Sequence, residues 1–392
     1  MQQPVTASPL RWRTPEAAVP DLKILPLLRQ AIAVAPHRVD LKLQLARVLR
    51  RAGAHAEIID LLKPAAVGNR ASPEVLLLLG RAALEVGEDQ LAVEVLHSAA
   101  AAGLNSALGY LAEALYRSDR PDEALDAAQR RLADWPTDFE ALQVVARVLF
   151  QRGEMDRLWR LSVDLRNKGA WGGWLPAVAA SAAAMLGRED DLKALCDSSR
   201  WFSAAKLSLP SNFNQRLATE LLALRPSAKT IRIDGLERGG VGGPASQDLL
   251  GRLRPAVESY IEQRERPPDH PIIAHRPEYA KLAAWAILTE ERMHHGWHIH
   301  QAGWISGVYY VEVPDIDYSR DKLAGAIEFG PYPFGEDDEK LRPYRWRVRP
   351  EPGLLLLFPS YFGHRTWPTG LAGPRISVAF DVRPIDPPLE SQ

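Results

Sequence analysis

The chain has 392 residues, of which 46% are apolar and 25% charged, and this composition is that of an ordinary globular protein rather than a disordered or fibrous one. Its 48 basic and 49 acidic residues give a formal charge of −1, so no overall field favours nucleic acid or an anionic membrane as a partner. The single cysteine excludes an intramolecular disulfide and a cysteine-based metal cage, and we predict a cytoplasmic protein without a membrane-spanning segment.

The length exceeds the roughly 100 to 200 residues of a typical domain, so we expect more than one domain. Residues 1–20 are an N-terminal extension, and the Ala- and Leu-rich residues 21–205 predict a helical domain. Residues 206–245 include the Gly-rich run LERGGVGGPAS and are predicted to be a linker. Residues 246–392 are predicted to form a second domain, because their sequence pattern is no longer that of the helical repeat.

A period of about 34 residues runs through the helical region. A small residue recurs inside the first predicted helix of each pair, and a turn residue follows it seven positions later. The small residues are Ala46, Gly80, Ala112, Ala146 and Ala180, and the turn residues are Gly53, Gly87, Asp119, Gly153 and Gly187. The pattern predicts at least five helix pairs over residues 21–200, with an irregular helical bundle as the alternative.

This pattern resembles the tetratricopeptide repeat family, and Pro36, Pro73 and Pro136 stand near the repeat junctions. The resemblance covers roughly half of the chain and implies a helical solenoid. The concave groove of such a solenoid usually holds an extended peptide or another protein.

Strand-like segments follow a helix that is predicted over residues 246–262, where Leu249, Leu253 and Val257 share one stripe. The segments are residues 281–290, 304–314, 325–330, 353–359 and 375–384. Their succession, with Pro, Gly and Asp between them, predicts an antiparallel β-sandwich or barrel. The fold class is therefore α+β multidomain, with an N-terminal helical solenoid before a C-terminal β domain.

Histidines gather just before the strand that ends in VYYV, at His294, His295, His298 and His300. On a strand, residues i and i+2 face the same side, so His298 and His300 can approach one metal ion. His364 emerges from the buried run GLLLLFP and offers a third imidazole. Farther on, Arg375 and Ser377 share one face of a predicted strand and can bind a carboxylate, with an internal salt bridge as the alternative for Arg375.

The segments HIHQAGWISGVYYVEVP, GAIEFG, PEPGLLLLFPSYFGHRTWP and GPRISVAFDV together resemble the 2-oxoglutarate- and Fe(II)-dependent oxygenases, related in pattern to prolyl hydroxylases. The resemblance covers residues 210–385 and implies a double-stranded β-helix of the jelly-roll, cupin-like kind. Similar proteins carry this domain behind tetratricopeptide repeats. The resemblance also implies Fe(II) as the metal, 2-oxoglutarate as co-substrate and O2 as the second co-substrate.

Specific roles for individual residues follow from this resemblance. The implied metal ligands, which are also the implied catalytic residues, are His298, His300 and His364. The implied co-substrate contacts are Arg375, Ser377, Tyr310 and Ser306. Arg375 and Ser377 would hold the far carboxylate of 2-oxoglutarate, and Tyr310 lies where related hydroxylases have a co-substrate tyrosine.

The chain departs from the usual pattern at His300, where most members of the class have Asp or Glu. Three histidines then hold the metal, or a carboxylate from Asp315, Asp317 or Glu328 ligates instead, or water or a halide takes the position. The tryptophans beside the predicted ligands line a substrate cleft or pack in the interior; they are Trp297, Trp304 and Trp367.

The predicted function is an Fe(II)- and 2-oxoglutarate-dependent dioxygenase that hydroxylates a side chain of a peptide or protein held with the help of the repeats. One alternative is a repeat scaffold whose oxygenase-like domain has lost catalysis with its carboxylate ligand. Another is an oxygenase that acts on a small or carrier-bound molecule. Neither nucleic acid nor a membrane is a predicted partner.

Overall fold

The computed structural model describes residues 10–13, 24–67, 71–170, 172–224, 230–232, 242–264, 269–335, 338–371 and 373–385. Its contacts divide the chain into two compact units. The helical unit is Ala18–Ala170, and the sheet unit combines Met1–Ala17 with Trp171–Gln392. The predicted α+β class, a helical array followed by a β domain, is confirmed.

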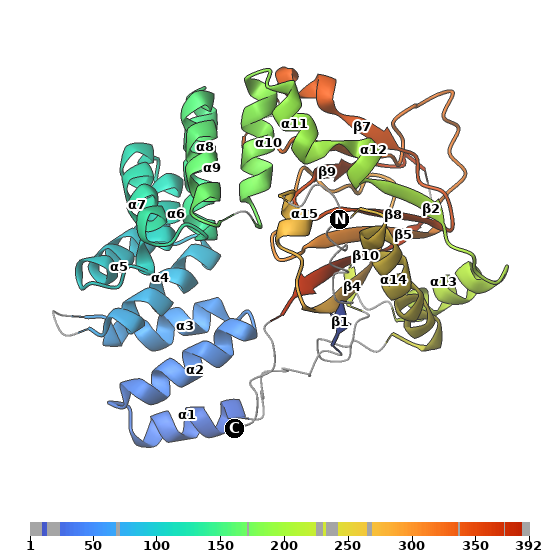
Figure 1. The fold of residues 1–392 in the computed structure, drawn as a ribbon. Helices are drawn as coiled ribbons and strands as arrows, with labels where there is room; N and C mark the ends of the chain where they lie inside the picture. The colour runs from blue at the N-terminus through green and yellow to red at the C-terminus, as the bar shows by residue number, and fades with distance from the viewer. Residues whose placement is uncertain are drawn as a thin grey trace, which may run out of the picture. The chain divides into compact units, whose positions relative to one another are not determined.

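Antiparallel helices stack in chain order through the helical unit (Figure 1). They are α1 (Ile24–Val34), α2 (Val39–Arg51), α3 (His55–Leu62), α4 (Pro73–Val86), α5 (Asp89–Ala101), α6 (Ala107–Arg117), α7 (Pro121–Asp134), α8 (Phe139–Gln151) and α9 (Met155–Asn167), with a 3-10 turn η1 at Lys63–Ala65. Helices α2 to α9 make four of the five predicted pairs. The fifth pair is α10 (Leu175–Met185) with α11 (Glu189–Cys196), and it belongs to the sheet unit.

The turn residues of the repeat all have a left-handed backbone. Their φ angles are 73° at Gly53, 81° at Gly87, 56° at Asp119, 69° at Gly153 and 66° at Gly187. This conformation ends a helix by satisfying its last carbonyls, and it favours glycine. The repeat that the sequence predicts is therefore present at the level of single residues.

The small residues of the repeat are all buried. Ala46, Ala112 and Ala146 have no exposed surface, and Ala180 is 1% exposed. At Gly80 a Cβ atom would overlap the buried side chain of Leu96 on the partner helix α5. The missing side chain at Gly80 thus allows α4 and α5 to approach each other closely.

The division between the units differs from the predicted boundary at residue 205, because α10 and α11 group with the sheet unit. Ser181 of α10 donates a hydrogen bond to the Tyr332 carbonyl at 2.7 Å, and Trp174 lies edge-on to the Tyr332 ring with centroids 5.2 Å apart. The fifth helix pair keeps the repeat spacing in sequence while its contacts tie it to the β domain. Tertiary packing, which the sequence period does not report, decides this grouping.

Part of the predicted linker is structured. Residues Phe213–Ala223 form α13, whereas residues 225–229 and 233–241 lie outside the described residues. Of the predicted N-terminal extension the structure describes residues 10–13, in which Arg11–Trp12 forms β1 and pairs in parallel with β4. The four-residue helix α12 (Ser198–Trp201) precedes α13.

Two sheets form the body of the sheet unit, and apart from the parallel β1–β4 pair their strands are antiparallel. The large sheet has the order β1-β4-β10-β5-β8-β2, with β3 also paired to β4, and the small sheet has the order β7-β6-β9. The strands are β2 (Ser203–Lys206), β3 (Thr230–Arg232), β4 (Tyr279–Thr289), β5 (Ile305–Glu312), β6 (Ile327–Gly330), β7 (Trp346–Val348), β8 (Leu354–Pro359), β9 (Gly363–Thr366) and β10 (Arg375–Pro384). The remaining helices are α14 (Pro244–Glu262), α15 (Pro271–Ala274) and the 3-10 helix η2 (Glu339–Tyr344).

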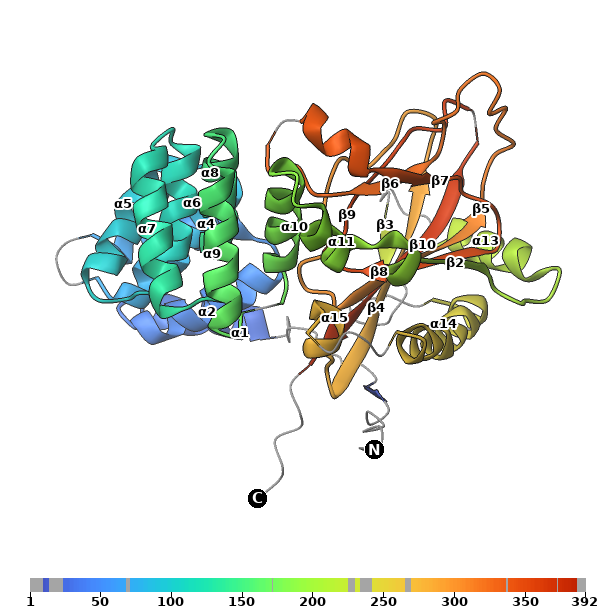
Figure 2. The ribbon, with the colours of Figure 1, turned by 45° about the horizontal axis from the view of Figure 1, so that its top comes forward.

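The central strands have two faces of different character. Ile376, Val378 and Phe380 of β10 belong to the same buried cluster as Leu249 and Leu253 of α14, and Figure 2 shows α14 beside the β4 side of this sheet. Because side chains alternate along a strand, the odd-numbered residues of β10 face the opposite way. That opposite face carries the candidate site. Among the described helices, none is long and apolar enough to cross a lipid bilayer.

Candidate metal centre

His298 and His300 lie on an irregular segment that precedes β5, not on a regular strand as predicted. Hydrogen bonds hold this segment against β9 and against the turn that precedes β9. The backbones of His298 and His364 exchange two hydrogen bonds of 3.0 Å each, and the His300 N–H donates to the Ser360 carbonyl at 2.9 Å. The two histidines therefore lie close together, as predicted, but for a different reason. Hydrogen bonds to β9 and to Ser360 place them, and not the alternation of side chains along a regular strand.

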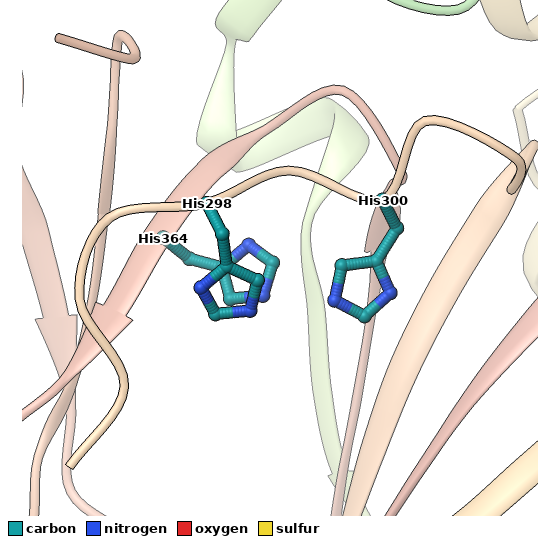
Figure 3. Close-up of side chains that lie close together, drawn as sticks. All are labelled: His298, His300 and His364. Carbon is teal, nitrogen blue, oxygen red and sulfur yellow. The ribbon is translucent and has the colours of Figure 1, made fainter. Parts of the chain in front are cut away.

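The three predicted histidines come together. Ring centroids are 4.2 Å apart for His298 and His364, 5.0 Å for His300 and His364, and 5.4 Å for His298 and His300. One ring nitrogen of each histidine lies within 4.8 Å of those of the other two. Figure 3 shows these nitrogens turned toward a common point, with two rings from the irregular segment and one from β9.

Each of the three imidazoles has its Nδ1 atom occupied by an acceptor. His298 Nδ1 lies 2.8 Å from the Gly296 carbonyl oxygen, and His364 Nδ1 lies 2.9 Å from that of Phe362. His300 Nδ1 contacts the carboxylate of Asp381. Since carbonyl and carboxylate oxygens only accept, each Nδ1 carries a proton, and a neutral ring in this arrangement has its free lone pair on Nε2. This is the tautomer that a histidine needs to bind a metal through Nε2.

Burial keeps two of these rings neutral. It lowers the pKa of His298 to about 4, against a hydrogen bond to the Gly296 backbone that acts in the opposite direction. Burial, with the neighbouring histidines, lowers the pKa of His364 well below its usual value. Neutral imidazole is the form that ligates divalent metals, so these rings are ready to bind at neutral pH without losing a proton.

No carboxylate joins this cluster within the described residues. Glu328 is fully buried but faces Arg347 and Arg365, with nitrogen to oxygen distances of 2.5 and 2.6 Å. Asp315 and Asp317 are both exposed on the loop after β5. Of the arrangements considered for the departure at position 300, the three-histidine set is the one that the side chains form.

A cavity of about 180 Å³ adjoins the three histidines. Arg375, Ser377 and Tyr310 line it from β10 and β5, where Ser377 and Tyr310 are register partners. Arg375 is 3% exposed, and it donates to the Thr289 hydroxyl at 3.1 Å and to the Gly325 carbonyl at 3.0 Å. Neither partner carries charge, and among the described residues no carboxylate is within ion-pair distance of Arg375.

Burial acts on both ionisable groups at this end of the cavity. It lowers the pKa of Arg375, and it raises the pKa of Tyr310 to about 12, although the nearby guanidinium works against that rise. Tyr310 is therefore a neutral hydroxyl at physiological pH. Tyr309 faces the other side of β5, where its hydroxyl donates to Asn214.

Ser306 is not among the residues that line the cavity, in contrast to its predicted role as a co-substrate contact. Its hydroxyl donates to the Asp381 carboxylate at 2.8 Å and lies 2.7 Å from the Ser360 hydroxyl. Ser306 and Asp381 are register partners on β5 and β10. The serine thus lies behind His300 rather than beside Arg375.

Asp381 is a residue that the sequence-based prediction missed. It shares the odd-numbered face of β10 with Arg375 and Ser377, and this parity in RISVAFDV could have identified it. Burial raises the pKa of Asp381, but the hydrogen bond and charge of His300, together with Arg383, outweigh this effect and leave it below the usual value. The carboxylate therefore stays ionised.

The three predicted cleft tryptophans do not line the cavity. Trp304 is buried and donates its indole N–H to the Ile272 carbonyl at 2.8 Å. Trp297 and Trp367 hold the guanidinium of Arg365 between them, at 4.9 and 4.7 Å from the ring centroids. Their contacts are those of interior and surface packing, the alternative that the sequence left open.

Comparison with protein families supports the class of site that this geometry defines. Residues 283–381 match the family described as "Putative 2OG-Fe(II) oxygenase". The matched segment contains all three histidines, Arg375 and Asp381. The sequence-based prediction of a 2-oxoglutarate- and Fe(II)-dependent oxygenase domain is thereby confirmed. No protein in the curated collections matches the chain.

Solved structures with some similarity belong to two groups. A prolyl-4-hydroxylase from Pseudomonas putida is 16% identical, with a TM-score of 0.35, over 53% of this chain and 100% of that protein. YrrB, described as a TPR protein with an unusual peptide-binding site, is 15% identical, with a TM-score of 0.35, over 42% of this chain and 86% of YrrB. MamA is 19% identical, with a TM-score of 0.32, over 42% and 88% of the two chains.

Proposed function

We propose that this protein is an Fe(II)- and 2-oxoglutarate-dependent dioxygenase that hydroxylates a side chain of a peptide or protein. One observation carries the proposal: a buried guanidinium without a described carboxylate partner faces the same cavity as three converging imidazoles. An unpaired buried charge costs several kcal/mol, so Arg375 requires an anion. A dicarboxylate that reaches from the metal to Arg375 meets that requirement.

The donor set fits Fe(II), since imidazoles suit first-row metals and three ligands on one side leave positions for further ligands. His298, His300 and His364 would hold the metal. Arg375 would bind the far carboxylate of 2-oxoglutarate as a fork, and the hydroxyls of Ser377 and Tyr310 would donate to the same co-substrate. Bound together, Fe(II) and 2-oxoglutarate supply the oxidising power of the reaction, in which O2 is reduced and 2-oxoglutarate is converted to succinate and CO2.

The size of the cavity favours a large substrate over a small one. Its 180 Å³ is below the roughly 300 to 1,000 Å³ typical of small-molecule sites, and the co-substrate would take much of it. The substrate would therefore offer only one side chain to the site while its remainder stays outside. This supports a peptide or protein over a free small molecule, although a carrier-bound group meets the same condition.

The helical unit offers a surface for such a partner. Cation–π contacts link the first helices of successive pairs, with Arg81 over the Tyr110 ring at 4.5 Å and Arg147 over the Tyr116 ring at 4.5 Å. We propose that an extended peptide segment binds along this surface of α4, α6 and α8. The cytoplasm, where Cys196 stays reduced, remains the predicted compartment.

Anaerobic titration tests the proposed metal and co-substrate together. Adding 2-oxoglutarate to the Fe(II)-loaded chain should produce the weak visible charge-transfer band of the chelate. The same titration of Arg375→Ala should need a much higher 2-oxoglutarate concentration. A chain that binds Fe(II) without developing the band would contradict the proposal.

Succinate formation separates the enzyme from an inactive scaffold, the alternative that the missing carboxylate ligand favours. An enzyme forms succinate slowly from 2-oxoglutarate even without substrate, and a scaffold forms none. For the docking surface, a Tyr110→Ala, Arg81→Ala pair of substitutions should lower hydroxylation of a protein substrate and leave this basal succinate formation unchanged. Equal losses in both assays would remove the helical surface from the proposal.

A further inference from the structure

We propose that Asp381 is a positioning residue of the metal centre, which holds His300 as the third ligand and supplies through that imidazole the negative charge of the missing ligand carboxylate. This inference rests on the proposed function only in requiring that a divalent metal binds the three histidines. It assigns a role to a buried acid that the oxygenase pattern does not predict.

The carboxylate of Asp381 is fixed at both oxygens. It is 2% exposed, and its Oδ1 accepts from the His300 Nδ1–H and from the Ser306 hydroxyl at 2.8 Å. Its Oδ2 accepts from Arg383 Nη2 at 3.1 Å. Because neither oxygen is free to turn away, the carboxylate fixes the direction of the His300 ring and keeps its Nε2 toward the other two histidines.

Asp381 gives His300 something that the other two rings lack. His298 and His364 direct Nδ1 at backbone carbonyls, which fix the tautomer but carry no net charge. His300 directs Nδ1 at the carboxylate of Asp381, which also pairs with Arg383, and a carboxylate partner raises the basicity of the opposite nitrogen. The ring with the charged partner occupies the position where the resemblance implies Asp or Glu. The charge is therefore present, one hydrogen bond farther from the metal.

The surroundings of this pair leave little room for another arrangement. Ser360 hydrogen-bonds to Ser306 at 2.7 Å through its hydroxyl and accepts the His300 N–H at 2.9 Å through its carbonyl. A Cβ atom on Gly303 would overlap the Ser360 hydroxyl and lie 3.4 Å from the Asp381 carboxyl carbon. The segment that carries His300 is thus fastened to the same serine that supports the carboxylate.

Co2+ binding to the full-length chain tests the inference without turnover. Affinity is measured by calorimetry, and ligand geometry by the visible absorption of bound Co2+. Asp381→Asn keeps the shape of the side chain and removes its charge, and it should weaken Co2+ binding by roughly 10- to 100-fold and alter the spectrum. Asp317→Asn is the matched control, because that acid is exposed and accepts from its own loop at Ser319. It should leave both measurements unchanged.

A second background separates action through His300 from a general effect of charge or folding. In His300→Glu the ligand at position 300 is itself a carboxylate and has no N–H to offer Asp381. Asp381→Asn in this background should leave Co2+ affinity unchanged or increase it, because it removes a like charge beside the new ligand. The same 10- to 100-fold loss in both backgrounds would overturn the inference, as would unchanged affinity in the native background.

Ser306→Ala covers the case in which Asp381→Asn fails to fold. It removes one donor to the Asp381 carboxylate and nothing from the cavity lining, and it should weaken Co2+ binding several-fold and shift the spectrum. A spectrum identical to that of the native chain would overturn the inference. Succinate formation is assayed separately, so a chain that shows the expected Co2+ behaviour without succinate would reject the proposed function and leave the role of Asp381 in place.

Discussion

Two arginines with little exposed side chain, one in each unit, have opposite surroundings. Arg131 of the helical unit has a side chain 12% exposed and forms an ion pair with Asp138 at 2.6 Å, and the same carboxylate caps α8 by accepting the Ala141 N–H at 3.1 Å. Arg375 of the sheet unit is more deeply buried and meets only a hydroxyl and a carbonyl. A carboxylate of the protein balances the charge of Arg131, whereas the charge of Arg375 has only uncharged partners and needs the anion of a ligand.

Histidines of the sheet unit repeat this contrast. His270 stacks on Trp201 at 3.5 Å and accepts the Ile272 N–H through Nδ1, so its ring is used by the fold. In His298 and His364, Nδ1 hydrogen-bonds to a nearby backbone carbonyl, and the Nε2 atoms of the two rings face each other. The site is therefore distinguished by histidines whose Nε2 atoms face one another and serve no contact within the fold.

The largest expected effect is the loss of the metal on replacing His364 by Ala. Outer partners of a metal ligand are worth about 10- to 100-fold in affinity, so removal of the ligand itself should cost more than about 100-fold. His294→Ala is the control, since that ring belongs to the same cluster in sequence but not to the three that converge. Calorimetric titration with Co2+ measures both. Equal Co2+ affinity in His364→Ala and His294→Ala would contradict the assignment of His364 as a metal ligand.

Arg375→Ala comes next in size and tests the arginine comparison directly. It should leave Co2+ affinity nearly unchanged and weaken 2-oxoglutarate binding by roughly 2–5 kcal/mol, the cost of leaving one member of a buried charged pair alone. Arg375→Lys should recover part of the loss, because it restores charge without the planar fork. The measurement is anaerobic calorimetry with Co2+ in the site. Unchanged 2-oxoglutarate affinity in Arg375→Ala would return this residue to a purely structural role.

Local patterns in the sequence predict what depends on near neighbours. The spacing of Ala46, Gly80 and their equivalents predicts the helix pairs, because each pair is a local unit. Strand positions from 281 to 384 are predicted to within a few residues for β4, β5, β6, β8 and β10, whereas the short strands β7 and β9 were not predicted. Short strands carry too few residues for alternation to be visible.

Pairing between distant segments is what the sequence cannot report. Alternation places Ser306 and Tyr310 on one face of β5, but only the register with β10 shows that Ser306 lies opposite Asp381 and Tyr310 opposite Ser377. His300 and Asp381 are 81 positions apart, and their contact depends on that register. The three histidines that the resemblance implies as ligands come together in the fold. Ser306, which the same resemblance implies as a co-substrate contact, instead hydrogen-bonds to Asp381.

Acid should destabilise the sheet unit through His270. Burial lowers the pKa of His270 to about 3, so between about 3 and its ordinary value of 6.5 the unfolded chain binds a proton that the folded chain does not. Stability therefore rises with pH across this window and falls as the pH is lowered through it, by about 1.4 kcal/mol per unit for one proton. His270→Asn keeps the acceptor for Ile272 and should lower this slope in urea unfolding of the metal-free chain between pH 7 and 5, while the lowered pKa values of His298 and His364 leave a residual slope. An unchanged slope would contradict the assignment.

Two glycines within helices, one in each unit, should respond to alanine with opposite signs. Gly80→Ala adds a Cβ that overlaps the buried Leu96 and should cost about 1–2 kcal/mol. Gly251 of α14 has no atom within 4 Å of an added Cβ, so Gly251→Ala should stabilise by about 0.5–1 kcal/mol through helix propensity. Urea unfolding measures both, and Co2+ affinity should stay unchanged. If both substitutions lowered the free energy of unfolding, close helix packing would not explain why position 80 is glycine.

The smallest effect belongs to Asp119, where the repeat has a left-handed residue other than glycine. Its φ of 56° costs an L-residue roughly 1 kcal/mol, while glycine would lose about 0.4–1 kcal/mol through the greater freedom of the unfolded chain. Asp119→Gly should therefore stabilise the helical unit by no more than about 0.5 kcal/mol. Gly153 lies at the equivalent turn with φ 69°. Gly153→Ala places an L-residue in this strained conformation and should destabilise the helical unit by about 1 kcal/mol. Thermal unfolding of the two variants side by side checks the sign. Destabilisation by Asp119→Gly would mean that the aspartate side chain stabilises its own turn by more than the backbone strain costs.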